Sequence, residues 1–293
     1  MVVPFPASGP ADVLARILSE RMRVSLGQTV VVENLAGAAG SIAVGRVARA
    51  APDGYTLILG NLGTHVFNGA IYSLGYDLVN DFEAVALLPS NNQLIIASNA
   101  TPASSLRELI AWVKSDPDKV TCGTAGPGSP SHIAAVYFQN AIGVRFQLVP
   151  YRGTPQVIQD LVAGQVNIVF DQVSSSLQQV RGGRIKAFAV TAKSRLAAAP
   201  EIPSVDEAGL PGFYTTFWFG LWAPKGTPAS IVERLNLALV DTMADENVRS
   251  RLGDLGSEIP PREQQSPQAL ASLQKAEIEK WWPIIKAAGI KAE

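Results

Sequence analysis

Short apolar runs alternate with longer stretches of helical periodicity along this chain. That alternation is typical of a parallel or mixed sheet whose faces are covered by helices. We expect strands at residues 30–33, 56–60, 85–88, 94–98, 120–123, 146–149, 166–170, 185–191 and 217–223. The sequence therefore predicts an α/β fold.

A helix is predicted directly after the first apolar residues. Its apolar side chains recur with helical spacing and form one stripe, made of Leu14, Ile17, Leu18 and Met22. Gly27 is expected to end this helix, because glycine readily adopts the left-handed conformation at a helix C-terminus. Further helices are expected near residues 228–243 and 267–288.

The length of 293 residues allows two domains. The composition changes at two places, which suggests that the chain crosses twice between two lobes. The apolar run 94–98 opens into Asn99, and the run 217–223 leads into a Pro- and Gly-containing segment. If both runs are hinge strands, residues 1–97 and 225–293 form one lobe and residues 98–224 form the other.

Charge and composition exclude several classes of partner and site. Lys plus Arg number 24 against 25 Asp plus Glu, so no basic surface for nucleic acid is expected. The apolar runs are far shorter than the roughly 20 residues that span a bilayer. Cys122 is the single cysteine, and His65 and His132 lack metal-ligand spacing. No metal or cofactor is expected.

The segment from Pro4 to Asp12 has the sequence of a tight loop leading into a helix N-terminus. The first N–H groups of a helix have no internal partner and carry its positive dipole end, so they can bind an anion. Pro10 suits the first helical position, and the Asp12 carboxylate can reach back. An ordinary connecting loop is the alternative interpretation, and the absence of Lys, Arg, Cys and His favours ligand holding over catalysis.

A second loop of the same character spans residues 123–132, and it offers small side chains, hydroxyls and a run of free N–H groups. Because it falls in the other lobe, the two loops are expected to face one cleft. Two further strand-end loops, at 61–65 and 171–174, are expected on the same rim. Trp218 is a possible cleft wall.

Catalytic motifs are incomplete in this chain. The second loop lacks the Lys of a phosphate-binding loop and the closing Gly of a hydrolase nucleophile elbow. Cys122 followed by His132 would allow a thiol nucleophile, but a Cys that ends an apolar strand is more often a small buried hydrophobe. Each histidine is expected to cap its helix or to order water in its loop rather than to carry out acid/base chemistry, and either could also touch a ligand.

Many segments, in order, resemble the substrate-binding receptors of tripartite tricarboxylate transporters, the Bug family. The residues that carry the likeness are 2–12, 34–40 (Asn-Leu-Ala-Gly-Ala-Ala-Gly), 51–57 (Ala-Pro-Asp-Gly-Tyr-Thr-Leu), 76–77, 81–82, 123–132, 149–153, 164–166, 170–171, 203–209 and 222–224. The likeness covers nearly the whole chain.

This resemblance implies a type II-like periplasmic binding-protein fold, in which two α/β lobes joined by two hinge strands close on a ligand. The expected ligand is a small carboxylate, namely a di- or tricarboxylate, an aromatic carboxylate or an acidic amino acid. Such a receptor is periplasmic and delivers its ligand to a membrane permease; we expect a monomer. The implied binding residues are Phe5, Ala7, Ser8, Gly9, Asp12, Asn61, Thr64, His65, Thr124, Ala125, Gly126, Ser129, His132, Asp171 and Gln172.

The chain departs from the family pattern at two places that bear on the ligand. Ser8 stands where the family usually has Gly, and Ala11 stands where it often has a hydroxyl. Asp171 would repel a second carboxylate of the ligand unless it caps backbone N–H groups or meets an amino group. No export signal precedes the first loop, so either a signal lay upstream or the protein is cytosolic. An enzyme using Cys122 and His132, and a sensory receptor, remain the alternative functions.

Overall fold

The computed structural model describes residues 1–287 and 289–291, and the chain divides into two compact units. Unit 1 comprises Met1–Ser90, Trp218–Gly253 and the described residues from Glu258 onward, and unit 2 comprises Asn91–Phe217 and Asp254–Ser257. The two main boundaries fall at residues 90 and 217, seven residues before the expected 97 and 224 in each case.

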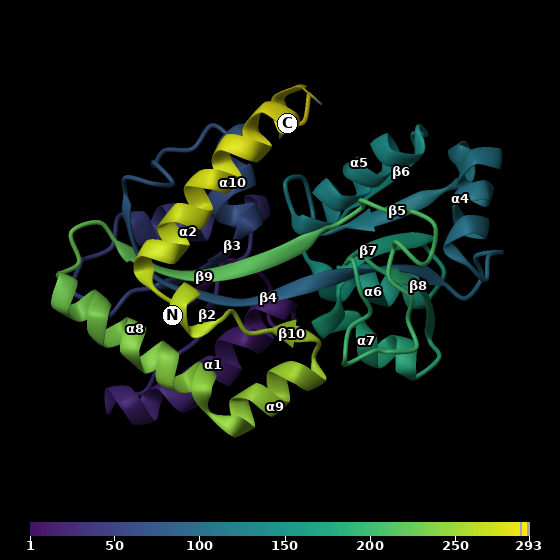
Figure 1. Cartoon of the computed structure of the whole chain (residues 1–293). Helices are drawn as coiled ribbons and strands as arrows, with labels where there is room; N and C mark the ends of the chain where they lie inside the picture. The colour runs from purple at the N-terminus through teal and green to yellow at the C-terminus, as the bar shows by residue number, and fades with distance from the viewer. Residues whose placement is uncertain (288, 292–293) are drawn as a thin grey trace. The chain divides into compact units, whose positions relative to one another are not determined.

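Unit 1 holds a small sheet with helices packed around it (Figure 1). Its helices are α1 (Pro10–Leu26), α2 (Ser41–Ala48), α3 (Asn68–Ile71), α8 (Ala229–Ala244), α9 (Glu246–Asp254) and α10 (Pro267–Ala287), with short 3-10 turns η1 (Ala38–Gly40) and η4 (Arg262–Gln264) and a π-helix η2 (Gly63–Phe67). Helix α8 packs against α1, and α10 packs against η2 and α3.

The sheet of unit 1 is mixed, in the order β2 (Glu33–Asn34), β1 (Val2–Val3), β3 (Ile58–Asn61), β9 (Thr216–Pro224). The first three strands are parallel and β9 runs antiparallel to β3. The strand expected at 30–33 is wrong in extent. Within the described residues, strand β2 pairs only with β1, which is two residues long, so the paired strand is limited to Glu33 and Asn34, and Val31 is exposed.

Unit 2 holds three parallel strands, β6 (Gln147–Pro150), β5 (Thr121–Thr124) and β7 (Ile168–Gln172). Strand β4 (Phe82–Ser98) runs antiparallel to β7, and β8 (Ile185–Val190) runs antiparallel to β4. The remaining elements are α4 (Leu106–Ser115), η3 (Pro117–Lys119), α5 (Pro130–Ile142), α6 (Thr154–Val162), α7 (Val173–Arg181) and the short strand β10 (Ser257–Glu258) at the boundary. The strands expected here are present, shifted by one or two residues.

Strand β4 is a single 17-residue strand, so the expectation of separate strands at 85–88 and 94–98 is wrong. The polar triplet Asn91, Asn92 and Gln93 looks in the sequence like a loop between two strands, but all three residues are buried within one strand. Asn91 Nδ2 donates to Ser257 Oγ at 2.9 Å, and Asn92 Oδ1 accepts from Thr216 Oγ1 at 2.6 Å. Because the Asn91 and Asn92 side chains and the Gln93 N–H find partners, the strand continues through them.

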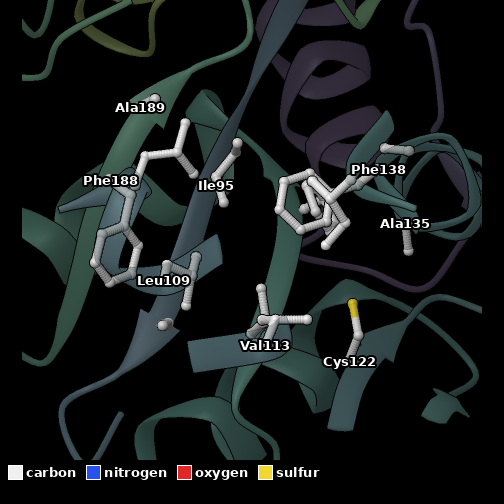
Figure 2. Packing of buried hydrophobic residues seen from close by; sticks show 14 of the residues in the cluster. Ile95, Leu109, Val113, Cys122, Ala135, Phe138, Phe188 and Ala189 are labelled. Atoms are coloured by element: carbon white, nitrogen blue, oxygen red, sulfur yellow. The ribbon is translucent and has the colours of Figure 1, made fainter. Parts of the chain in front are cut away.

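One core cluster of unit 2 lies between its sheet and helices α4 and α5 (Figure 2), and a second cluster lies on the other face of the sheet, against α6 and α7. Phe138 of α5 packs against Phe170 of β7, with ring centroids 5.0 Å apart. The Cys122 side chain sits in this cluster with Val113 and Ala135 and has no exposed surface. The prediction that Cys122 is a buried hydrophobe is confirmed.

Candidate functional site

The first loop lies between β1 and α1 and has the geometry that the sequence predicts. Gly9 is the N-cap, Pro10 is the first helical residue, and Gly27 ends the helix in the left-handed conformation. Asp12, the third helical residue, reaches back: its Oδ2 accepts from the Ser8 N–H at 2.8 Å and from Arg16 Nε at 3.0 Å. The buried carboxylate thereby ties the loop to the helix.

Ser8 adopts a left-handed conformation, with φ of 66°, which is costly for a residue that carries a Cβ. The bond from its N–H to Asp12 holds it there. Burial of Asp12 opposes ionisation, but the hydrogen bonds from Arg16 and from Ser8 outweigh it, so the pKa of Asp12 lies below its usual value. Asp12 is thus ionised at neutral pH, and the loop keeps one fixed shape.

Three segments of unit 1 converge behind this loop. A Cβ placed on Gly40 would lie 2.8 Å from both Pro4 Cβ and Thr64 Cγ2, so only glycine allows the segments to approach this closely. The Phe5 carbonyl accepts from Asn34 Nδ2 at 3.0 Å. These contacts make the first loop part of a packed assembly, although Ala7 and Ser8 themselves stay exposed.

The segment at 61–65 is not the strand-end loop that the sequence suggests. Asn61 ends β3, and residues 63–65 begin the buried π-helix η2. Asn61 Oδ1 accepts from the Thr64 N–H at 3.1 Å, and Thr64 Oγ1 lies 2.9 Å from His65 Nδ1. The His65 ring stacks on Trp222 of β9 at 3.7 Å between centroids. Ligand contacts at Asn61, Thr64 and His65 stay predictions.

His65 is expected to make unit 1 sensitive to acid. Complete burial lowers the pKa of His65 to about 3, against 6.5 in an unfolded chain. The unfolded state therefore binds a proton that the folded state excludes, so stability is complete above pH 6.5 and falls as the pH drops toward 3. Below pH 6.5 the free energy of unfolding is expected to fall by about 1.4 kcal/mol for each pH unit.

This expectation is tested by comparing wild type with His65→Phe, whose ring can still stack on Trp222. Urea unfolding from pH 7 to 4.5 should show wild type losing stability relative to the variant below pH 6.5. If the difference in free energy of unfolding between the two proteins stays constant across this pH range, the lowered pKa of His65 is contradicted. The comparison is needed because the raised pKa of Asp171 acts in the opposite direction and is present in both proteins.

The second loop connects β5 to α5 and is held by its own hydrogen bonds. Ser131 Oγ accepts from the Ala125 N–H at 2.8 Å, His132 Nδ1 from Gly128 at 3.2 Å, and Ser129 Oγ from His132 at 3.3 Å. Gly126 also accepts from the Ser129 N–H, at 3.1 Å. The expected run of free N–H groups is therefore interrupted, because the N–H groups of Ala125, Gly128, Ser129 and His132 already donate to side chains or to a carbonyl of the same loop.

His132 acts as an acceptor within this loop. Burial lowers the pKa of His132, so its ring is neutral, and the Gly128 N–H bond to Nδ1 leaves the proton on Nε2. With positive φ at Gly126 and Gly128, the loop takes a turn that other residues would strain. The histidine therefore orders its loop.

Asp171 and Gln172 were expected in one loop but are the last residues of β7, which passes directly into α7. Successive residues of a strand point to opposite faces, so the two side chains diverge. Asp171 turns toward the face of Val169 and Val173, where the Ser175 hydroxyl donates to it. Burial raises the pKa of Asp171 to about 6, partly offset by that hydrogen bond.

Sequence reasoning missed Gln93, which lies opposite Gln172 on the paired strand β4. Gln93 is buried, and its Oε1 has no hydrogen-bond partner among the described residues. The same holds for Thr124 Oγ1 and Gln172 Oε1. The available signal was the polar triplet at 91–93 between two apolar runs, because polar residues inside a strand are a marked exception.

Thiol chemistry is disfavoured by the surroundings of Cys122. Complete burial raises the pKa of the Cys122 thiol, so the reactive thiolate is suppressed. Among the described residues no group of three or more His, Cys, Asp and Glu side chains is placed to hold a metal ion. Within the same residues, no helix combines the length and the apolar character that crossing a bilayer needs.

Solved structures of binding proteins match this fold over nearly its full length. The periplasmic binding protein BugD is 39% identical, with a TM-score of 0.95 and coverage of 100% of this chain and 98% of BugD. MatC from Rhodopseudomonas palustris, solved with bound malate, is 40% identical with a TM-score of 0.92 and 97% coverage of both chains. A second R. palustris protein, solved with adipate, is 32% identical with a TM-score of 0.93 and coverage of 99% and 97%.

These matches define the chain as a protein of the periplasmic binding-protein fold, as predicted. The family model described as "Tripartite tricarboxylate transporter family receptor" matches residues 14–290. The chain belongs to this family of solute-binding receptors, which includes the Bug proteins.

Proposed function

We propose that this chain is an extracytoplasmic receptor that binds a small carboxylate and delivers it to the permease of a tripartite transporter. Family membership supports the receptor role and a periplasmic location. The malate and adipate carried by two structural relatives support a carboxylate as the ligand.

The geometry of the first loop carries this proposal. The α1 N-terminus begins at Pro10 without a side-chain cap on its first turn, so its backbone dipole is available to an anion. Asp12 and Ser8 fix the loop before any ligand arrives, which lowers the ordering cost of binding. The proposed carboxylate contacts in unit 1 are Phe5, Ala7, Ser8 and Gly9, positioned by Asp12.

The second loop would supply the contacts from unit 2, through Thr124, Ala125, Gly126, Ser129 and His132. A ligand that touches both loops binds the closed arrangement of the units more tightly than the open one, and it shifts the population by that difference. Because several N–H groups of the second loop are already used, ordered water is a suitable bridge to the ligand.

A carboxylate ligand should stabilise the protein measurably. At about 100 times its dissociation constant, a ligand adds roughly 2.7 kcal/mol to the free energy of unfolding. A thermal-shift panel of mono-, di- and tricarboxylates, acidic amino acids, sugars and cations is expected to give its largest shift with a carboxylate. The recovered ligand should be chemically unchanged after incubation. A hit confined to sugars or cations, or a converted ligand, would contradict the proposal.

A further inference from the structure

Gln93 and Gln172 face each other across the paired strands β4 and β7. The antiparallel register sets Gln93 directly opposite Gln172 and Ile95 opposite Phe170. Because side chains alternate along each strand, Gln93 lies on the same face as Ile95, and Gln172 lies on the same face as Phe170. Both apolar residues belong to the core cluster under α5. The two glutamines therefore lie on the same face of the sheet, next to this cluster, where the face becomes polar.

Thr124 lies on the same face, one strand further along. On β5 it follows Cys122, a member of the same core cluster, by two residues. The parallel register pairs Gly123 with Val169, which places Thr124 beside Phe170. Gln172 is two residues beyond Phe170, so Thr124 and Gln172 are diagonal neighbours on adjacent strands. Side chains at diagonal positions are about 7–8 Å apart. The second loop continues from Thr124, so this cluster and the loop share one end of the sheet.

Each of these side chains has a buried acceptor atom that lacks a hydrogen-bond partner among the described residues. Gln93 Nε2 donates to the Phe170 carbonyl at 3.3 Å, which fixes the amide and leaves Oε1 unpartnered. Gln172 Oε1 and Thr124 Oγ1 are also unpartnered among the described residues. The exposed fractions are 1% for Gln93, 5% for Gln172 and 1% for Thr124.

Two carbonyl oxygens cannot satisfy each other, because each needs an N–H or O–H donor. In the second loop, the N–H groups of Ala125, Gly128 and His132 are already bonded to side chains of that loop. Leaving buried acceptors unpaired is costly, and native proteins keep such groups mainly where a water or a ligand completes them.

We propose that Gln93 and Gln172 form a subsite for a hydrogen-bond donor on the carbon chain of the ligand, a hydroxyl or an ammonium group. The inference rests on the proposed carboxylate function and narrows its ligand class. The ligand is then a hydroxy- or amino-substituted dicarboxylate, and the unsubstituted dicarboxylate is discriminated against. Thr124, whose hydroxyl can donate or accept, completes the subsite.

Asp171 does not belong to this subsite. It is adjacent to Gln172 in the chain, but its side chain points to the opposite face of the sheet, where Ser175 donates to it. The subsite is therefore neutral. It selects by hydrogen bonding, and a hydroxyl group meets its requirement without any charge.

Calorimetric titration with matched ligand pairs tests this inference. The pairs are succinate with L-malate and L-aspartate, glutarate with 2-hydroxyglutarate and L-glutamate, and adipate with 2-aminoadipate. At the chain length that binds best, the substituted ligand should bind about 10- to 100-fold more tightly than the unsubstituted one. Preference for the hydroxy or for the amino member identifies the donor, and either supports the subsite.

Gln172→Leu should reduce this ratio toward one, because the variant removes an acceptor without breaking any of the described side-chain bonds. Gln93→Leu should act in the same way, although it also removes the bond to Phe170. Gln139→Leu is the matched control, since Gln139 is a buried glutamine of unit 2 whose amide is already bonded to Phe146 and Arg145. The control should retain the preference of wild type.

Equal affinity for substituted and unsubstituted ligands in wild type would overturn the subsite. A preference that survives in Gln172→Leu and Gln93→Leu would also overturn it. In both cases the carboxylate proposal still holds, because a carboxylate binds. Absence of binding by every carboxylate would overturn the proposed function itself.

Discussion

Asp12→Ala is expected to weaken carboxylate binding about 10- to 100-fold. Asp12 holds the Ser8 N–H at 2.8 Å and keeps Ser8 in the left-handed conformation. Without the carboxylate, Ser8 relaxes toward ordinary backbone angles, and the ligand must restore a conformation that costs about 1–3 kcal/mol. Each 1.4 kcal/mol of that cost is a tenfold loss of affinity. Calorimetric titration measures the change.

The same substitution should lower the free energy of unfolding by only about 1 kcal/mol. The bond to Ser8 is a single hydrogen bond of ordinary strength, and Arg16, the ion-pair partner, is 55% exposed and therefore contributes little. Affinity is thus expected to fall far more than stability. A variant that unfolds globally, or one that keeps full affinity, would contradict the role assigned to Asp12.

Two further variants separate the shape of the loop from a general weakening of unit 1. Ser8→Gly should gain up to about 1 kcal/mol of stability, because glycine adopts positive φ without strain. Since Ser8 is itself a proposed ligand contact, this variant tests the backbone strain by its stability alone. Asp245→Ala is the affinity control: it removes a comparable ion pair with Arg21 elsewhere in unit 1 and should leave affinity unchanged. A loss of binding in Asp245→Ala would show that a general weakening of unit 1 explains the Asp12 result.

Gly60→Ala is expected to destabilise unit 1 by roughly 3 kcal/mol. A Cβ at this position would collide with the His65 ring and lie 2.9 Å from Thr64 Oγ1. The ring cannot move aside easily, because it stacks on Trp222 with an interplanar angle of 6° and bonds to Thr64. Inserting atoms into such a packed core typically costs 1–3 kcal/mol, and the rigid ring places this site at the upper end.

Gly253→Ala is the matched control for that change. Gly253 lies in α9 of unit 1 with no atom within 4 Å of the added Cβ. Since alanine is the better helix former, this variant should be neutral or slightly more stable. Chemical unfolding of both variants gives the comparison, and equal stabilities would contradict the packing account of η2.

The first helix and its loop follow from local sequence rules. Pro10 at the first helical position, Asp12 at the third and Gly27 at the end each act through bonds within a few residues. Such features depend little on the rest of the chain, so the sequence predicts them. The strands of unit 2 are likewise predictable to within one or two residues, because most of their apolar runs are buried and are bounded by polar or turn residues.

Features that depend on distant partners could not be predicted in this way. The continuation of β4 through Asn91–Gln93 requires Ser257 and Thr216, which lie far along the chain. Burial of His65 requires the Trp222 ring on β9. In each case a tertiary partner satisfies a group that local reasoning assigns to a loop.

The divergence of Asp171 and Gln172 has a different origin. Polar residues after an apolar run look like a strand-end loop, but here they remain in β7 and pair with β4. Once they belong to a strand, alternation sends one to each face. The register therefore decides that Gln172 and Gln93 form the polar end of the core face, and that Asp171 does not.

The central claim is that loops of both units hold one carboxylate. Hydrogen exchange of the backbone amides, with and without the best-binding carboxylate, tests it directly. The account predicts that ligand slows exchange in residues 5–12 of unit 1 and in residues 124–132 of unit 2 together. Slowing in only one of these segments, or in neither, would contradict it.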